Sequence, residues 1–206
     1  MKKEICKRLV SLVIILFGLS IMTFGLTYIL PSNPAEQLAE SMGAGHDREV
    51  IAKIEEKYGL NKSFGEQYIS WLKGALHGDF GMSVKYAQPV SQVLGRKLPN
   101  TIKLAVASFI LMLLISFPLG ILSAVYKDKA ADYIIRFMSF LGISLPSFWG
   151  GMMLIYLLAV NLHWLPVGGS DSFKSLIMPA ITLSLSMSAY YIRRIRAVMV
   201  EQMNEE

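Results

Sequence analysis

One long apolar stretch, which begins at Ile134 and ends in a Trp-Leu-Pro-Val-Gly-Gly turn at Gly169, constrains this chain more than any other feature. Its apolar part is long enough to cross the hydrocarbon core of a bilayer, which is about 30 Å thick. Trp164 stands where the apolar residues give way to the turn, and tryptophan is enriched at membrane–water interfaces. The stretch therefore predicts a membrane span from Ile134 to His163, followed by a turn.

The middle of this predicted span contains a proline, which can bend a helix, and two glycines, which allow a neighbouring helix to come close. Pro146 lacks a backbone N–H, so we expect it to bend the helix. Gly150 and Gly151 have no side chains and favour the close approach of another helix. These three residues, together with Pro118 in an earlier span, are predicted to be kink and packing positions.

Three further apolar stretches complete the pattern. Leu9–Leu30 is too long for the apolar region of a cleaved signal peptide and ends without a small-residue cleavage site. Thr101–Tyr126 contains Pro118 and Gly120, where we expect a kink. Leu176–Ile192 is the last stretch. Only 17% of the residues are charged, against about 25% in soluble domains, so we predict an all-α polytopic membrane protein with about four transmembrane helices.

The basic residues gather beside these spans. With four crossings, the N-terminal Lys/Arg cluster, the Lys127–Arg136 loop and the Arg193–Arg196 cluster all fall on one side of the membrane. Cytoplasmic loops carry an excess of Lys and Arg, so the pattern predicts that both termini lie in the cytoplasm. The net charge of +5 is explained by this orientation. We therefore expect the chain to contact membrane lipid and not to bind nucleic acid.

One long polar segment, Pro31–Pro99, separates the first span from the others. Asp47–Gly59 and Phe64–His77 both show apolar residues at helical spacing, and Val90–Leu98 is expected as a separate short amphipathic stretch. Helices of this size cannot bury a core alone, so we expect them to lie on the membrane or on a partner. The predicted domains are an N-terminal transmembrane helix (1–30), an extracytoplasmic helical cap (31–99) and a transmembrane domain of three helices (100–206).

The fourth span carries hydroxyl side chains at alternate positions. Thr182 and Ser186 are one helical turn apart, as are Ser184 and Ser188, so two faces of the helix carry hydroxyls. One hypothesis is that these residues line a polar translocation path. The alternative is that they mediate helix packing and form hydrogen bonds between helices.

No catalytic or metal-binding pattern stands out. The sequence has no nucleophile elbow, no Gly-rich phosphate loop and no His-Glu helix motif. Cys6 is the single cysteine, and His46, His77 and His163 lack ligand spacing. The fourth span contains no acidic residue, lysine or histidine, which argues against an ion-coupled carrier. We therefore predict a protein that is not an enzyme and that has no cofactor.

The order of motifs resembles the permease subunit of peptide/nickel-type ABC importers. That family has an S-x-P-x-F span, a W-L-P-x-x-G turn and a second Leu-Pro motif opening the next span, and its cap carries a Gln-Tyr-x-x-Trp-Leu pattern leading to Gly-Asp-x-Gly-x-Ser. The matching residues are Ser144, Pro146, Phe148, Trp164, Leu165, Pro166, Gly169, Met178, Pro179 and Ala180, and in the cap Gly59, Leu60, Gln67, Tyr68, Trp71, Leu72, Gly78, Asp79, Gly81 and Ser83.

The resemblance implies a partial type I ABC importer permease fold and a set of partners: a second permease subunit, two cytoplasmic ATPase subunits and an extracytoplasmic substrate-binding protein. Tyr68, Trp71 and Asp79 would contact the binding protein, or would only brace the cap. The implied cargo is nickel, a metal chelate or a short peptide, and the run around Arg136 and Phe148 resembles the nickel members more closely.

The family's coupling loop and about two further spans would follow Glu206, so the resemblance covers about the first two-thirds of a family member. We therefore expect a chain truncated at its C-terminal side. The alternative function is a truncated, non-transporting membrane remnant or anchor that binds a partner through its cap.

Overall fold

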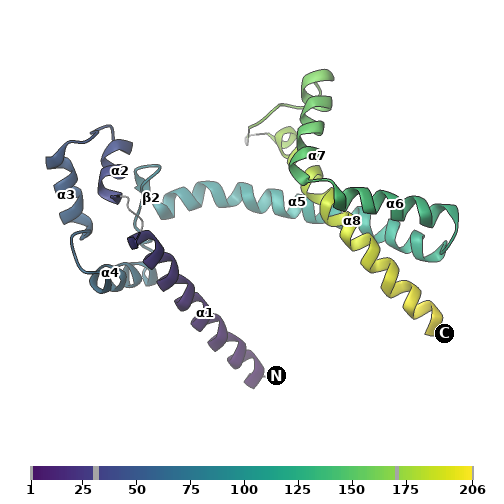
Figure 1. Cartoon of the computed structure of the whole chain (residues 1–206), viewed down its shortest axis with the longest axis horizontal. Helices are drawn as coiled ribbons and strands as arrows, with labels where there is room; N and C mark the ends of the chain where they lie inside the picture. Colours follow the sequence, from purple (N-terminus) through teal and green to yellow (C-terminus); the bar gives the residue numbers. More distant parts are fainter. Residues whose placement is uncertain (1, 30–32, 170–171, 206) are drawn as a thin grey trace. The chain divides into compact units, whose positions relative to one another are not determined.

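The computed structural model describes residues 2–29, 33–169 and 172–205, and nearly all of these lie in helices. The chain divides into two compact units, residues 1–97 and residues 98–206, which are described separately (Figure 1). The expected junction at Leu30–Pro31, between the first span and the cap, lies outside the described residues.

In its described residues, the first unit contains one long helix and three short ones, besides the beginning of a further helix. The long helix α1 (Lys2–Ile29) is followed by α2 (Pro34–Ser41), α3 (Arg48–Tyr58) and α4 (Phe64–Leu76). Helix α3 begins and ends as predicted: the side chain of Asp47 accepts a hydrogen bond from the backbone N–H of Glu49, and Gly59 ends the helix in the left-handed region at φ 65°. A capping box between Ser63 and Glu66 starts α4.

The cap has a small apolar core of its own. Ala35, Leu38 and Ala39 of α2 pack against Ile54 of α3, and all four are buried. The short antiparallel strands β1 (Met82–Ser83) and β2 (Gln88–Pro89) follow α4. Helix α2 and this hairpin were not predicted, because eight residues and two-residue strands are too short for a clear periodic signal.

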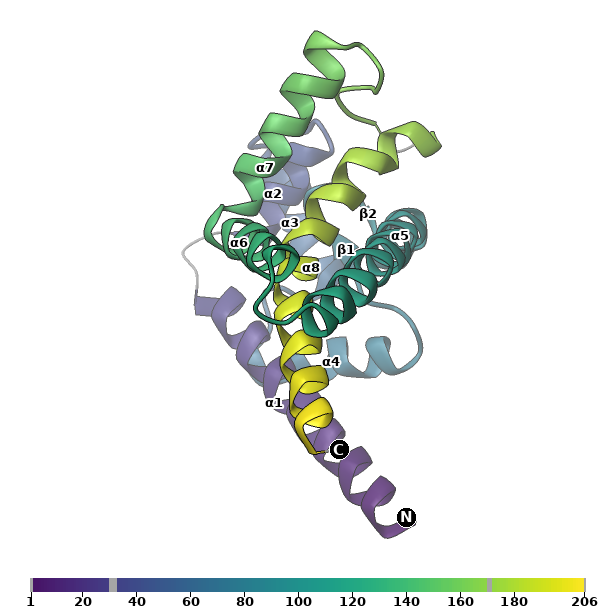
Figure 2. The same cartoon turned by 90° about the vertical axis from the view of Figure 1, so that its right-hand side faces the viewer.

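The second unit is built around helix α8 (Phe173–Glu205). Its other elements are α5 (Val90–Val125), whose first residues belong to the first unit, α6 (Ala130–Ser144), α7 (Ser147–Leu154) and the π-helix η1 (Ile155–Asn161). Helix α8 lies against both α6 and α7 (Figure 2). By length and composition α1, α5 and α8 can each cross a membrane, and the bent pair of α6 with α7–η1 supplies a fourth span if it counts as one.

The predicted third span is not one continuous helix, which corrects the sequence-based expectation of a kinked span. It consists of two helical segments that meet at an angle of 100°. Leu145, the residue before Pro146, adopts an extended conformation with ψ 130°, and Pro146 caps α7. The proline ring disfavours the helical conformation of the preceding residue, so the helix ends where a kink was expected.

The second predicted span also differs from expectation. The amphipathic stretch 90–98 and the span that follows form one helix, α5, which runs through both Pro99 and Pro118. A single proline removes one backbone hydrogen bond, and the remaining bonds of a long apolar helix can hold it together.

Candidate functional site

Two hydroxyl residues of α8 face the interior of the second unit. The side chains of Ser184 and Ser188 are 0% and 2% exposed. The Ser184 hydroxyl donates to the carbonyl oxygen of Ile181 at 3.0 Å, whereas the Ser188 hydroxyl has no hydrogen-bond partner within the described residues. On this face the chain's own helices cover both side chains.

The other hydroxyl pair, Thr182 and Ser186, is partly exposed. The Thr182 hydroxyl donates to the carbonyl oxygen of Met178 at 2.8 Å, so its hydrogen atom is bonded within α8. Hydroxyls bonded to their own backbone in this way are tolerated in an apolar surrounding and still present a polar lone pair outward. This pair is less deeply buried than Ser184 and Ser188.

Three glycines bring other helices into close contact with α8. A Cβ atom added to Gly120 of α5 would lie 2.8 Å from Cβ of Ile195, and one added to Gly142 of α6 would lie 2.9 Å from Cβ of Ala189. Both distances are too short for real carbon atoms, so the backbones approach more closely than any side chain allows. At Gly151 of α7 the corresponding distance to Cγ2 of Thr182 is 3.3 Å.

The predicted packing positions thus have different surroundings. Gly151 lies against α8, whereas nothing lies within 4 Å of the position that a Cβ of Gly150 would take. Pro118 is exposed on the unbroken helix α5. Pro146 separates α6 from α7.

A buried ion pair fastens α8 to the start of α6. The carboxylate of Asp132 is 0% exposed and accepts hydrogen bonds from Nε of Arg196 at 2.7 Å and from Nη2 of the same residue at 2.5 Å. The hydroxyl of Ser123, on α5, donates to it at 2.6 Å, and the backbone N–H of Asp128 donates at 3.0 Å. One carboxylate therefore connects α5, the turn after it, α6 and α8.

Sequence reasoning placed Asp132 and Arg196 only in charged loops and did not pair them. They are 64 positions apart, so no local spacing relates them. The available signal was an aspartate in the first turn of a mostly apolar helix, directly after a lysine-rich turn. Because all donors around it are satisfied, this carboxylate serves as a structural junction rather than a free proton carrier.

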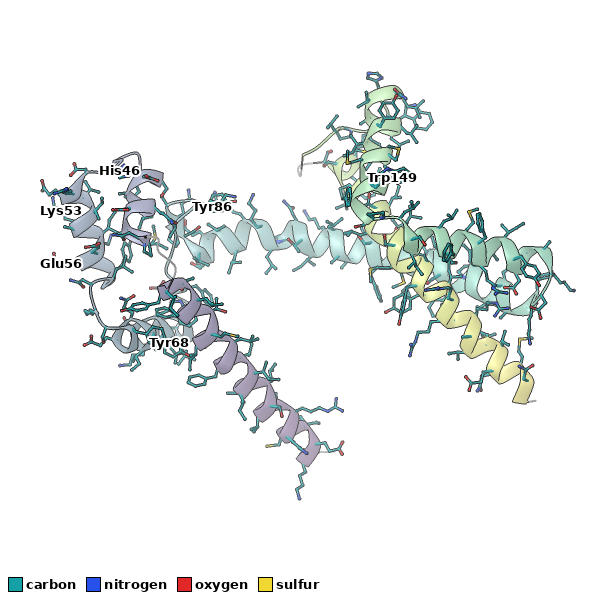
Figure 3. The ribbon with its side chains drawn as sticks, viewed as in Figure 1. His46, Lys53, Glu56, Tyr68, Tyr86 and Trp149 are labelled. Atoms are coloured by element: carbon teal, nitrogen blue, oxygen red, sulfur yellow. The ribbon has the colours of Figure 1, made fainter. Side chains whose placement is uncertain are left out.

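In the cap, aromatic rings join α4 to α1. Tyr68 is 7% exposed, and its hydroxyl lies 2.7 Å from the Ser20 hydroxyl of α1. Its ring contacts that of Phe24 at a centroid distance of 5.5 Å, and Phe24 also contacts Phe64 and Trp71 at 5.6 and 6.0 Å. Figure 3 shows Tyr68 on α4, beside the end of α1. Tyr68 therefore braces the cap against the first helix.

The other two predicted cap residues line one pocket. Trp71 and Asp79 border an opening of about 680 Å³ between α1, α2, α3 and α4, whose wall also includes Tyr28, Tyr58 and Glu55. Asp79 is exposed, and its carboxylate accepts a hydrogen bond from the backbone N–H of Gly81 at 2.9 Å. This pocket combines aromatic rings with two carboxylates.

The described residues form surfaces for contact rather than a metal-binding site. Among the described residues no group of three or more His, Cys, Asp or Glu side chains is placed to hold a metal ion. What the two units present instead are apolar helix surfaces, a hydroxyl-bearing face on α8 and an aromatic pocket in the cap.

Comparison with known proteins identifies the chain's relatives. Residues 116–206 match the family described as binding-protein-dependent transport system inner membrane component, and residues 1–105 match the N-terminal part of the same kind of membrane component. The oligopeptide transport system permease protein AppB of Bacillus subtilis is 36% identical over all of this chain and 68% of its own length. The metal-staphylopine import system permease protein CntB of Staphylococcus aureus is also 36% identical, over all of this chain and 67% of its own length.

The glutathione transport system permease protein GsiC of Escherichia coli is 31% identical, again over the whole of this chain and 66% of its own length. The chain thus spans about two-thirds of the length of these relatives. The matched family consists of membrane transport permeases and not of enzymes, and its inner-membrane character agrees with the apolar helices α1, α5 and α8. The chain therefore belongs to the permease family of binding-protein-dependent ABC importers.

Proposed function

We propose that this chain is a permease subunit that carries short peptides or metal–chelate complexes across the cytoplasmic membrane. It would pair with a second permease, two ATPase subunits and an external binding protein. Closure of the ATPases on ATP would drive alternating access between the two permeases. The names of the relatives, which refer to oligopeptide, metal-staphylopine and glutathione transport, support this class of cargo.

The observation that carries the proposal is the two-sided character of α8. Its Ser184/Ser188 face is buried against the chain's own helices, while Thr182, which lies beside Gly151 of α7, and Ser186 are only partly covered. The hydroxyls of Thr182 and Ser186 would line the path where the second permease approaches. A path lined by hydroxyls would suit cargoes that carry both amide groups and charges, because hydroxyls donate and accept hydrogen bonds without binding any ion tightly.

Labelling by a water-soluble maleimide tests this assignment. In a variant with Cys6 replaced by serine, the chain has no other cysteine, so single replacements Thr182→Cys and Ser186→Cys report on water access. We expect both to react in the assembled complex and Ser184→Cys to remain unlabelled. Equal labelling at all three positions, or none at 182 and 186, would contradict the assignment of the path.

We further propose that both termini lie in the cytoplasm, because all three basic clusters then face inward. Cys6 is exposed near the N-terminus and provides a natural reporter. A membrane-impermeant maleimide should leave it unmodified in intact cells and modify it after permeabilisation. Modification in intact cells would reverse the proposed topology.

The cap would meet the binding protein through Trp71 and Asp79, which share the cap pocket. Trp71→Ala and Asp79→Asn should weaken the docking of the loaded binding protein to the complex, measured by surface plasmon resonance on nanodiscs. The exposed Lys53→Gln on α3, outside the pocket, serves as the matched control. Unchanged docking in all three variants would leave the cap a bracing element only.

Uptake identifies the cargo and tests the function as a whole. The complex, co-purified from the native operon and reconstituted, should hydrolyse ATP faster when its loaded binding protein is present. Comparing a labelled tripeptide with a radioactive nickel chelate then separates the two cargo classes. Failure to assemble with a permease and ATPases would support the alternative of a membrane anchor.

A further inference from the structure

The second unit contains a basic pocket that the transport role does not use. It has a volume of about 470 Å³ and lies between α6 and α8, on the side where α6 begins. One face of α6 and one face of α8 supply its walls, since the contributing positions are spaced three or four residues apart on each helix. The lining residues are Tyr133, Arg136, Phe137, Phe140, Arg193 and Arg196.

The three arginines of this pocket are not all neutralised. Arg196 is paired with the buried Asp132. The Arg136 guanidinium lies 5.7 Å from the ring centroid of Tyr133, a cation–π contact that leaves its charge in place. Arg193 is exposed and has no acidic partner within the described part of the chain. The pocket therefore carries three positive charges against one negative charge, and two guanidinium groups are available to bind an anion.

The aromatic walls restrict the kind of anion. Tyr133, Phe137 and Phe140 are 58%, 56% and 60% exposed and form a stripe along one face of α6. Arg136 is only six residues from the start of α6, at about 9 Å along the helix. That distance places the guanidinium near the headgroup layer if the charged Lys127–Lys129 turn lies in water, with Phe140 deeper in the hydrocarbon region.

We propose that this pocket binds an anionic phospholipid. The headgroup phosphate would accept hydrogen bonds from Arg136 and Arg193, because guanidinium groups bind phosphate oxygens in a bidentate manner. The acyl chains would cover Phe137 and Phe140. Basic pockets between membrane helices are known sites for anionic headgroups, and a free phosphate ion would leave the aromatic stripe uncovered.

Native mass spectrometry of the whole chain, released from nanodiscs into detergent, tests the proposal. We expect retention of phosphatidylglycerol but not of phosphatidylcholine. Because each basic residue near a membrane surface contributes about fivefold in affinity, Arg136→Gln with Arg193→Gln should weaken phosphatidylglycerol binding by roughly 25-fold. Arg194→Gln is the matched control: it removes the neighbouring charge on α8, outside the pocket, and should leave binding unchanged.

Three results would overturn the proposal. Equal binding of both lipids by the wild-type chain would remove the requirement for an anion, whatever the variants do. An equal loss in the Arg194→Gln control would indicate general surface charge. Displacement of the lipid by millimolar inorganic phosphate would assign the pocket to a small anion. Arg193→Gln alone breaks no ion pair given in the structure, so it keeps the test independent of folding.

Discussion

Asp132→Asn keeps the size of the side chain but removes the charge that four hydrogen-bond donors share. The asparagine amide has only one oxygen that can accept hydrogen bonds. Its NH₂ group is itself a donor, so it cannot accept from the donors that bind the second carboxylate oxygen. Removing one partner of a buried ion pair costs about 3–5 kcal/mol. Arg196 is 19% exposed and can partly return to water, so we expect a loss near the lower end, about 3 kcal/mol.

The reciprocal change should cost more. In Arg196→Gln the Asp132 carboxylate stays fully buried, with only the Ser123 hydroxyl and the Asp128 N–H as donors. We expect about 4–5 kcal/mol for this variant. The double variant should lose clearly less than the sum of the two, by about 2 kcal/mol or more, because neither charge is then left without its partner.

Reversible unfolding in mixed detergent micelles, followed by tryptophan fluorescence, measures these free energies. Glu49→Gln is the matched control, since the exposed pair of Glu49 with Lys53 joins two residues on one helix and should contribute nothing measurable. A single-variant loss under about 1 kcal/mol, or strictly additive single effects, would refute the role of Asp132 as a junction. Either result would mean that the surrounding helices hold their positions through apolar contacts alone.

Three further outcomes are expected. Gly142→Ala should cost about 1–3 kcal/mol, because its new Cβ would lie 2.9 Å from a neighbouring side chain on α8, whereas Gly150→Ala should cost nothing. Thermal unfolding compares the two variants, and equal losses of stability would contradict the contact between α6 and α8. Tyr68→Phe should cost about 0.5–1.5 kcal/mol by removing the hydrogen bond to Ser20, and no loss would mean that the ring packing alone holds α4 on α1. Hydrogen bonds from the hydroxyl and backbone N–H at the start of α4 lower the pKa of Glu66, so its stabilising effect is present above about pH 4.5 and is lost as the pH falls through the lowered pKa. The stability difference between wild type and Glu66→Gln should therefore shrink as the pH falls below about 4.5, and a difference that does not change with pH would show that the ionised carboxylate is not what caps the helix.

Local chemistry explains why the cap helices were predictable. Asp47 and Gly59 bound α3, as the sequence predicts, whereas the Ser63–Glu66 capping box that begins α4 is a local signal that was not used in the prediction. Each of these signals acts between residues within one turn of each other, so it can be read without knowing the fold. The ends of these helices are therefore set by residues that are close together in the sequence.

The sites of contact between helices were not predictable in the same way. Gly151 and Gly150 have the same local sequence signal, yet only Gly151 meets α8. Gly120 and Gly142 were not predicted as packing sites, although both lie closer to α8 than Gly151 does. Which glycine faces a neighbour depends on the rotation of its helix, and rotation is fixed by all contacts of that helix together.

The apolar stretches, the helix caps and the motif order determined the class of this protein by themselves, because membrane insertion and capping depend on local composition. The tertiary structure alone decided that Pro146 separates two segments at 100° rather than bending one span. It also decided which hydroxyls of α8 are buried, and that Asp132 and Arg196 meet across 64 positions of sequence. The physical reason is that charge pairing and close helix contact act through space, so only the folded arrangement brings their partners within reach.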